Sequence, residues 1–122
     1  MKFYKCASCA KLLSVIDDAP CTPRCCGEAM KELVANTTDG AKEKHVPVYE
    51  VKDGVVTVCV GSAAHPMLPE HFIDFVALRT KSGCQVKKLH AGEEPKVSFA
   101  VLPGDEIVEV YEYCNLHGLW KA

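Results

Sequence analysis

The spacing of the cysteines is the feature that most constrains the fold of this chain. Five of the eight cysteines fall within the first 26 residues, and the others lie far apart at Cys59, Cys84 and Cys114. A segment of about 35 residues cannot bury a stabilising apolar core, so a metal would have to supply much of its folding free energy. The distribution predicts a small metal-bound domain at 1–35 and a larger domain at 36–122, separated at the turn-forming stretch Asn36-Thr37-Thr38-Asp39-Gly40.

The first candidate metal site is a set of four cysteines. Cys6 and Cys9 form a Cys-x2-Cys pair, and Cys25 and Cys26 stand side by side before Gly27. Four thiolates suit either iron or zinc, so a redox iron and a purely structural zinc are both consistent with this pattern. Cys21 is interpreted as a spare thiol, because four thiolates already complete a tetrahedral shell.

The larger domain has the pattern of an antiparallel β-sandwich. Short apolar or alternating segments follow one another, separated by turn residues such as Asp53-Gly54 and Pro103-Gly104. Ile73, Phe75 and Ala77 are expected on one face of their strand, and Val97, Phe99 and Val101 on one face of another. At least six strands and no amphipathic helix are predicted, with strand residues at 46–51, 55–60, 71–80, 84–89, 97–101 and 107–113.

Composition and charge exclude several classes of protein. The chain has 48% hydrophobic and 25% charged residues, which is typical of a globular protein, and it contains no apolar run of membrane-spanning length. A net charge of −2 without a basic stripe argues against a nucleic-acid partner. The N-terminus enters the first cysteine motif at once and does not resemble a secretory signal, so a cytoplasmic location is predicted, where cysteine clusters more often hold metal than disulfides.

A second candidate site combines histidines with a cysteine from three distant places. His45 follows Glu43-Lys44, His65 and His71 flank a turn-rich segment, and Cys114 precedes His117 at ligand spacing. Each histidine alone would be interpreted as a surface residue, but a β-sandwich can bring distant loops to one end. His90 is predicted to be a surface residue, whereas Cys59 and Cys84 are expected as buried thiols without chemistry.

Over essentially its whole length the chain resembles desulfoferrodoxin, the two-iron form of superoxide reductase. The segment His65-Pro66-Met67 and the closing residues 113–122 are also similar to the family pattern. The resemblance implies an all-β protein with a desulforedoxin-like N-terminal domain and an immunoglobulin-like, neelaredoxin-like catalytic sandwich. It further implies a first iron on Cys6, Cys9, Cys25 and Cys26, and a catalytic iron on His45, His65, His71, Cys114 and His117.

The resemblance also implies the activity. Superoxide would be reduced by one electron to hydrogen peroxide at the ferrous site of four histidines and one cysteine, as an antioxidant defence. The expected partners are a rubredoxin-like electron donor and a second copy of the chain, joined through the small N-terminal units. Two irons per chain are expected, with zinc as a substitute in the four-cysteine site. Lys44 would attract superoxide, Glu43 would supply a carboxylate to the ferric resting state, and backbone N–H groups near Leu116 and His117 would hydrogen-bond the Cys114 sulfur.

Two functions from other classes are distinguishable from this reductase. A pure electron carrier would use the four-cysteine iron while the second metal only stabilises the sandwich. A zinc-filled structural or interaction module would be colourless and would not respond to reductant or superoxide.

Overall fold

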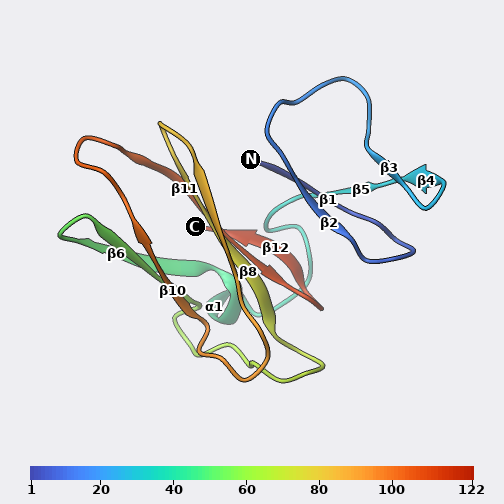
Figure 1. Cartoon of the computed structure of the whole chain (residues 1–122). Helices are drawn as coiled ribbons and strands as arrows, with labels where there is room; N and C mark the ends of the chain where they lie inside the picture. Colours follow the sequence, from blue (N-terminus) through green and yellow to red (C-terminus); the bar gives the residue numbers. More distant parts are fainter. The chain divides into compact units, whose positions relative to one another are not determined.

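The computed structural model describes residues 1–122, which divide into two compact units, Met1–Val34 and Ala35–Ala122 (Figure 1). Each unit has its own elements and is described by itself. Neither contains a helix that is long and apolar enough to cross a membrane.

The first unit is a small β structure with very little core. Strands β1 (Lys2–Lys5), β2 (Leu12–Val15) and β5 (Lys31–Leu33) form an antiparallel sheet in the order β2-β1-β5. A separate short hairpin consists of β3 (Arg24–Cys25) and β4 (Glu28–Ala29). One core cluster of this unit contains Tyr4, Cys6 and Met30, with Val15 and Cys25 packed against it, and Phe3 is also buried. So little apolar burial is consistent with a unit that depends on a bound metal for stability.

The second unit consists of two antiparallel sheets and one helical turn. The sheet orders are β10-β7-β6 and β12-β11-β8-β9, so the all-β prediction is confirmed. The elements are α1 (Lys42–His45), β6 (Pro47–Lys52), β7 (Val55–Val60), β8 (Ile73–Thr80), β9 (Cys84–Lys88), β10 (Lys96–Ala100), β11 (Ile107–Cys114) and β12 (Gly118–Lys121).

The core of the second unit lies between its two sheets. Alternate residues of β7 and β10 meet alternate residues of β8 and β11, and the buried cluster includes Val58, Phe99, Val76, Val110 and Cys114. Because Cys114 belongs to this cluster, the end of β11 is fixed by core packing. The predicted shared face of Val97, Phe99 and Val101 is confirmed, since all three pack on the cluster.

Strand β8 differs from the prediction. Ile73 packs in the core with Val76 and Leu78, whereas Phe75 lies outside that cluster and stacks on Tyr113 with ring centroids 5.5 Å apart. The expectation that Ile73, Phe75 and Ala77 share a face is therefore wrong. A register shift against β11 between the pairs of Ile73 and Phe75 explains the change of face, because an irregularity breaks strict alternation.

Two further expectations need correction. Cys59 and Cys84 lie in strands as predicted, but both thiols are exposed, because Cys59 is on the outer face of β7 and Cys84 begins the edge strand β9. The helical turn α1 and strand β12 were not predicted from the sequence. His90 is exposed, as expected.

Candidate metal centres

The second unit brings all five residues of the second predicted site together. The ligand atoms of His45, His65, His71, Cys114 and His117 lie within 4.8 Å of one another. His45 ends α1, His65 and His71 come from the segment between β7 and β8, Cys114 ends β11, and His117 lies in the turn before β12. Loops from one end of the sandwich thus build the cluster.

The four imidazole rings lie at the corners of a square. Going round it, the ring centroids are 4.8 Å apart for His45–His65, 4.7 Å for His65–His71, 5.0 Å for His71–His117 and 4.8 Å for His117–His45. The diagonal from His45 to His71 is longer, at 6.5 Å. Neighbouring rings are nearly perpendicular, with interplanar angles from 72° to 80°. This arrangement lets one nitrogen of each ring approach a common centre.

The tautomers of His45 and His65 are set by the backbone. His45 Nδ1 lies 2.7 Å from the Ala41 carbonyl oxygen and His65 Nδ1 lies 2.6 Å from that of Pro66, so each Nδ1 carries the proton and donates it. Each Nε2 is therefore left with a lone pair. The two Nε2 atoms are only 3.2 Å apart, with no proton to share between the neutral rings. Two converging lone pairs require a cation between them.

His71 and His117 complete the ring of donors. His71 Nε2 is buried and has no hydrogen-bond partner, which is costly unless a metal takes the lone pair. His117 presents Nδ1, which lies 3.1 Å from His45 Nε2 and 3.7 Å from Cys114 Sγ. Burial lowers the pKa of His45 and His71, and lowers that of His65 to about 4. Burial thus favours the neutral, metal-binding form of His45, His65 and His71.

Cys114 supplies the sulfur of this site. It is fully buried, and burial raises the pKa of its thiol, while the backbone N–H groups of His117 and Leu116 hydrogen-bond the sulfur and oppose that shift. The two N–H donors are those expected from the sequence. A metal cation would add a much stronger preference for the thiolate.

Neighbouring groups fix the ligands in place. Trp120 stacks on His45 with ring centroids 5.0 Å apart and donates its indole N–H to the His117 carbonyl at 3.0 Å. The Asn115 side chain accepts the Phe72 N–H at 2.9 Å and donates to the Glu70 carbonyl at 3.0 Å. Asn115 therefore ties the segment that carries His71 to the end of β11. Such supporting contacts are typical of metal ligands.

Glu43 and Lys44 lie on the same helical turn as His45, and both are exposed. The Glu43 carbonyl accepts hydrogen bonds from the Ala63 N–H at 2.9 Å and the Ser62 hydroxyl at 3.2 Å, which anchors the turn to the segment after β7. The charge of Lys44 contributes to the lowered pKa of His71, after burial and the charge of His117. Lys44 is thus close enough to the cluster to influence its electrostatics.

The first unit gathers Cys6, Cys9, Cys25 and Cys26, whose sulfurs lie within 4.8 Å of one another. The sulfurs of Cys9 and Cys25 are 3.7 Å apart, and those of Cys25 and Cys26 are 3.9 Å apart. Tetrahedral bonds of about 2.3 Å to a central ion give sulfur separations of about 3.8 Å. The spacing therefore fits a four-thiolate metal site.

The backbone at Cys26 explains how two adjacent cysteines reach one centre. Cys26 has φ of 51° and Gly27 has φ of 78°, so both occupy the left-handed region. They form the two-residue turn of the hairpin in which Cys25 pairs with Glu28. A backbone hydrogen bond from Cys9 is the main reason why the pKa of Cys6 is lowered to about 7, which favours its thiolate.

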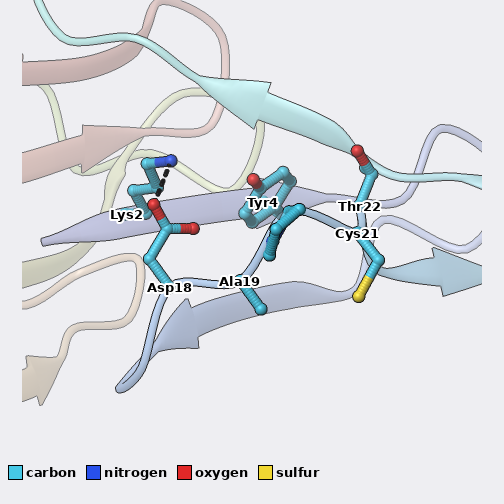
Figure 2. A pocket seen from close by; sticks show the side chains of 7 residues that line it. Lys2, Tyr4, Asp18, Ala19, Cys21 and Thr22 are labelled. Atoms are coloured by element: carbon cyan, nitrogen blue, oxygen red, sulfur yellow. Dashed lines mark ion pairs between the residues drawn. The ribbon is translucent and has the colours of Figure 1, made fainter.

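Cys21 does not belong to the four-cysteine cluster. Its exposed thiol lines an open pocket of about 440 Å³ beside Tyr4 and Thr22 (Figure 2). At the opposite end of the view, Lys2 and Asp18 form an ion pair of 2.6 Å. The placement of Cys21 outside the cluster agrees with its interpretation as a spare thiol.

Sequence reasoning did not identify Glu112, which is completely buried two residues before Cys114. Neither carboxylate oxygen has a hydrogen-bond partner, and burial raises the pKa of this group to about 9. The burial of Glu112 could have been suspected only from the alternation of a strand, in which every second residue lies on the same face. Glu112 stands between Val110 and Cys114, which both lie on the inner side of β11.

The chain is similar in sequence and in fold to several known proteins. The family model described as desulfoferrodoxin matches residues 37–122. A desulfoferrodoxin from Nitratidesulfovibrio vulgaris is 42% identical over 121 residues, covering 99% of this chain and 94% of the relative. The superoxide reductase structure from Treponema pallidum has a TM-score of 0.85 and 41% identity, covering 99% of this chain and 97% of that one. A one-iron superoxide reductase from Giardia intestinalis has a TM-score of 0.55 and 33% identity, covering 66% of this chain and 96% of that one.

The fold and the two ligand clusters define a metal-binding oxidoreductase of the superoxide reductase type. This chain belongs to the desulfoferrodoxin family.

Proposed function

We propose that this protein reduces superoxide to hydrogen peroxide at an iron held by His45, His65, His71, Cys114 and His117. The observation that carries the proposal is the pair of His45 and His65 Nε2 lone pairs, 3.2 Å apart and without a proton to share. The buried, unpartnered Nε2 of His71 supports it. Four neutral nitrogens and one sulfur fit ferrous iron, an ion that accepts imidazole and thiolate ligands.

When bound, ferrous iron supplies the single electron that superoxide accepts before protonation to hydrogen peroxide. The chain's residues supply the charge balance for this reaction. Four neutral imidazoles and one thiolate leave a divalent ion with about one net positive charge, which favours a small anion. The exposed Lys44 adds positive charge next to His71.

Cys114 and Glu43 have different roles in the proposal. The Cys114 sulfur donates electron density to the iron, and the N–H groups of Leu116 and His117 tune that donation by hydrogen bonding. The exposed Glu43 carboxylate, on the same helical turn as His45, would be a ligand for the oxidised iron. Ser62 and Ala63 hold that turn through the Glu43 carbonyl.

The first unit is proposed to hold the other iron of the chain, on Cys6, Cys9, Cys25 and Cys26, with zinc as a substitute. Its four converging thiolates support a role in receiving electrons from a rubredoxin-like donor. We further infer a homodimer, and a cytoplasmic location because eight free cysteines suit a reducing compartment.

Product analysis tests this function. Reduced, iron-loaded protein is mixed with superoxide, and both peroxide and oxygen are quantified. One peroxide per superoxide with no oxygen is expected, because the protein supplies the electron. Oxygen formed together with peroxide would indicate dismutation, and no consumption would favour an electron carrier or a metal-stabilised module. Replacement of His90, which lies outside the cluster, should leave the yield unchanged.

A further inference from the structure

The pocket beside Cys21 is lined by side chains of the first unit alone, and none of them belongs to a metal centre. Its volume of about 440 Å³ lies in the range of small-molecule sites, and it is open to solvent. Figure 2 shows the ion pair of Lys2 and Asp18 at one end of the pocket, and Cys21 and Thr22 at the other. The Tyr4 ring lies between these two ends in the same view.

Tyr4 places an unpaired hydroxyl group at the wall of this pocket. Its side chain is only 8% exposed, and its ring packs with Cys6 and Met30 in the core of the unit. The hydroxyl group makes no hydrogen bond within the chain, although a buried phenol normally finds a partner. A side chain that is more than nine-tenths buried, with its one polar atom free at a pocket wall, points to a ligand as the missing partner.

The charged groups of the pocket complement a molecule with both signs of charge. Lys2 Nζ lies 2.6 Å from Asp18 Oδ2, and the two side chains are 41% and 56% exposed, so both can also contact a bound molecule. The hydrogen bond with Asp18 is the main reason why the pKa of Lys2 is raised, and Tyr4 contributes to the same shift. The Tyr4 hydroxyl is therefore close to the Lys2 ammonium. These two groups can donate to a carboxylate, while Asp18 can accept from an ammonium group.

Cys21 adds a group that can form a covalent bond. Its thiol is exposed and lies outside the four-cysteine cluster, so a metal ion in that cluster leaves it free to react. Cys59 and Cys84 are exposed thiols as well, but they lie on strands of the second unit and outside this pocket. Cys21 thus combines a nucleophile with neighbouring polar groups that can hold a small molecule.

We propose that Cys21 is a site of S-thiolation, at which the pocket selects low-molecular-weight thiols of the amino-acid class, which carry both a carboxylate and an ammonium group. The Cys21 thiolate attacks one sulfur of the symmetric disulfide of such a thiol. A bond forms between Cys21 Sγ and that sulfur, and the disulfide bond breaks. The other half leaves as a thiolate and takes up the proton that Cys21 lost. The disulfide is the oxidant, and attack by a free thiol reverses the step.

The pocket also sets the orientation of the bound group. The carboxylate lies against Lys2 and Tyr4, the ammonium group against Asp18, and the sulfur against Cys21. A thiol without these charges forms the same mixed disulfide but gains no contact with the charged groups. Selectivity must therefore appear as a charge-dependent rate at Cys21. The proposal concerns the first unit and does not depend on the reaction at the histidine site.

The relative rates of two thiols in the metal-loaded full chain test the proposal. The protein is treated with cystine, glutathione disulfide or neutral 2-hydroxyethyl disulfide, and peptide mass spectrometry follows modification of Cys21 and Cys59. Cys59 is the matched thiol, because it is exposed and pairs with Lys96 across the sheet, which gives it a neighbouring cation. The ratio of the Cys21 rate to the Cys59 rate should be about tenfold higher with a charged disulfide than with the neutral one. The charged disulfide with the higher ratio shows whether an amino acid or a tripeptide fits the pocket.

Two variants connect this preference with the pocket. Tyr4→Phe keeps the buried ring and removes only the hydroxyl group, and Asp18→Asn removes the charge that faces the ammonium group. Each should lower the charged-to-neutral preference at least about threefold. Rates with the neutral disulfide and the four-thiolate absorption should stay unchanged, which distinguishes recognition from a loss of fold. Equal rate ratios for charged and neutral disulfides would overturn the proposal, and so would a preference that both variants retain.

Discussion

The Nε2 atoms of His45 and His65 lie 3.2 Å apart, although each ring already donates its Nδ1 proton to a backbone carbonyl. The backbone therefore forces two lone pairs toward one point. Burial lowers the pKa of both rings, which prevents a proton from relieving the repulsion. A metal ion at that point satisfies both nitrogens, and this accounts for the geometry of the whole cluster.

Removal of one donor should empty this centre. In His71→Ala the site loses a buried nitrogen that has no other partner, so iron affinity should fall by more than the roughly 10–100-fold typical of supporting residues. Equilibrium dialysis against ferrous iron under anaerobic conditions measures the change. His90→Ala removes an exposed histidine and should retain full affinity; equal losses in both variants would contradict the assignment.

The four-cysteine site should be separable from the histidine site. Cys25→Ser removes a sulfur that lies 3.7 and 3.9 Å from two others, so the four-thiolate absorption and the ordered amide signals of residues 1–34 should both be lost. The spectrum of the histidine site should persist, because each unit has its own core. Cys21→Ser is the matched control, and loss of metal in that variant would place Cys21 among the ligands.

Gly61 should be required for the position of the turn that carries Glu43 and Lys44. Gly61 has φ of 77°, and an added Cβ would lie 2.6 Å from the Lys44 and Ala63 carbonyl oxygens and 2.7 Å from that of Glu43. Gly61→Ala should lower the free energy of unfolding by more than the roughly 1–2 kcal/mol of left-handed strain alone, and should slow superoxide consumption.

Gly104→Ala separates the cost of left-handed backbone strain from the cost of the Cβ contact with carbonyl oxygens. Gly104 has φ of 84°, but its added Cβ would meet nothing within 4 Å. Urea unfolding of both variants should therefore show the smaller loss for Gly104→Ala. Equal losses would mean that the contact with the Glu43–Lys44 carbonyls has no energetic role.

Glu112 should make stability depend on pH. Burial raises the pKa of the folded-state carboxyl to about 9, above its ordinary value of 4.5, so the folded protein binds the proton more tightly than the unfolded chain. Stability should therefore be greatest below pH 4.5 for this group and fall as pH rises toward 9, by up to about 1.4 kcal/mol per pH unit. Glu112→Gln cannot ionise, so the difference in unfolding free energy between variant and wild type should grow across that range. A constant difference would show that Glu112 has an unshifted pKa.

The strands that could be predicted are those with simple patterns. Val55–Val60 alternates cleanly and follows Asp53-Gly54, so its bounds agree with the structure. Strand β8 was also predicted, but both of its faces are buried and its register against β11 shifts, so the face of each residue could not be assigned from the pattern. The α1 turn has four residues, too few for a helical period, and β12 directly follows the ligand motif of Cys114 and His117.

The candidate ligands could be chosen from the sequence, but their arrangement could not. Residue spacing indicates that Cys114 and His117 can share an ion, whereas the square of imidazoles depends on three loops brought together by the fold. Glu112 was missed for a different reason. A charged residue in a strand is normally assigned to the exposed face, and only the structure places it without a partner beside the core.

Pulse radiolysis of the reduced, iron-loaded protein can follow superoxide decay and the spectrum of the histidine-ligated iron together. If this iron reduces superoxide, superoxide should disappear at a rate proportional to protein concentration, in step with oxidation of that iron. His71→Ala should lose this reaction and His90→Ala should keep it. Superoxide decay at the spontaneous rate, with the iron still reduced, would show that the histidine-ligated iron does not react with superoxide.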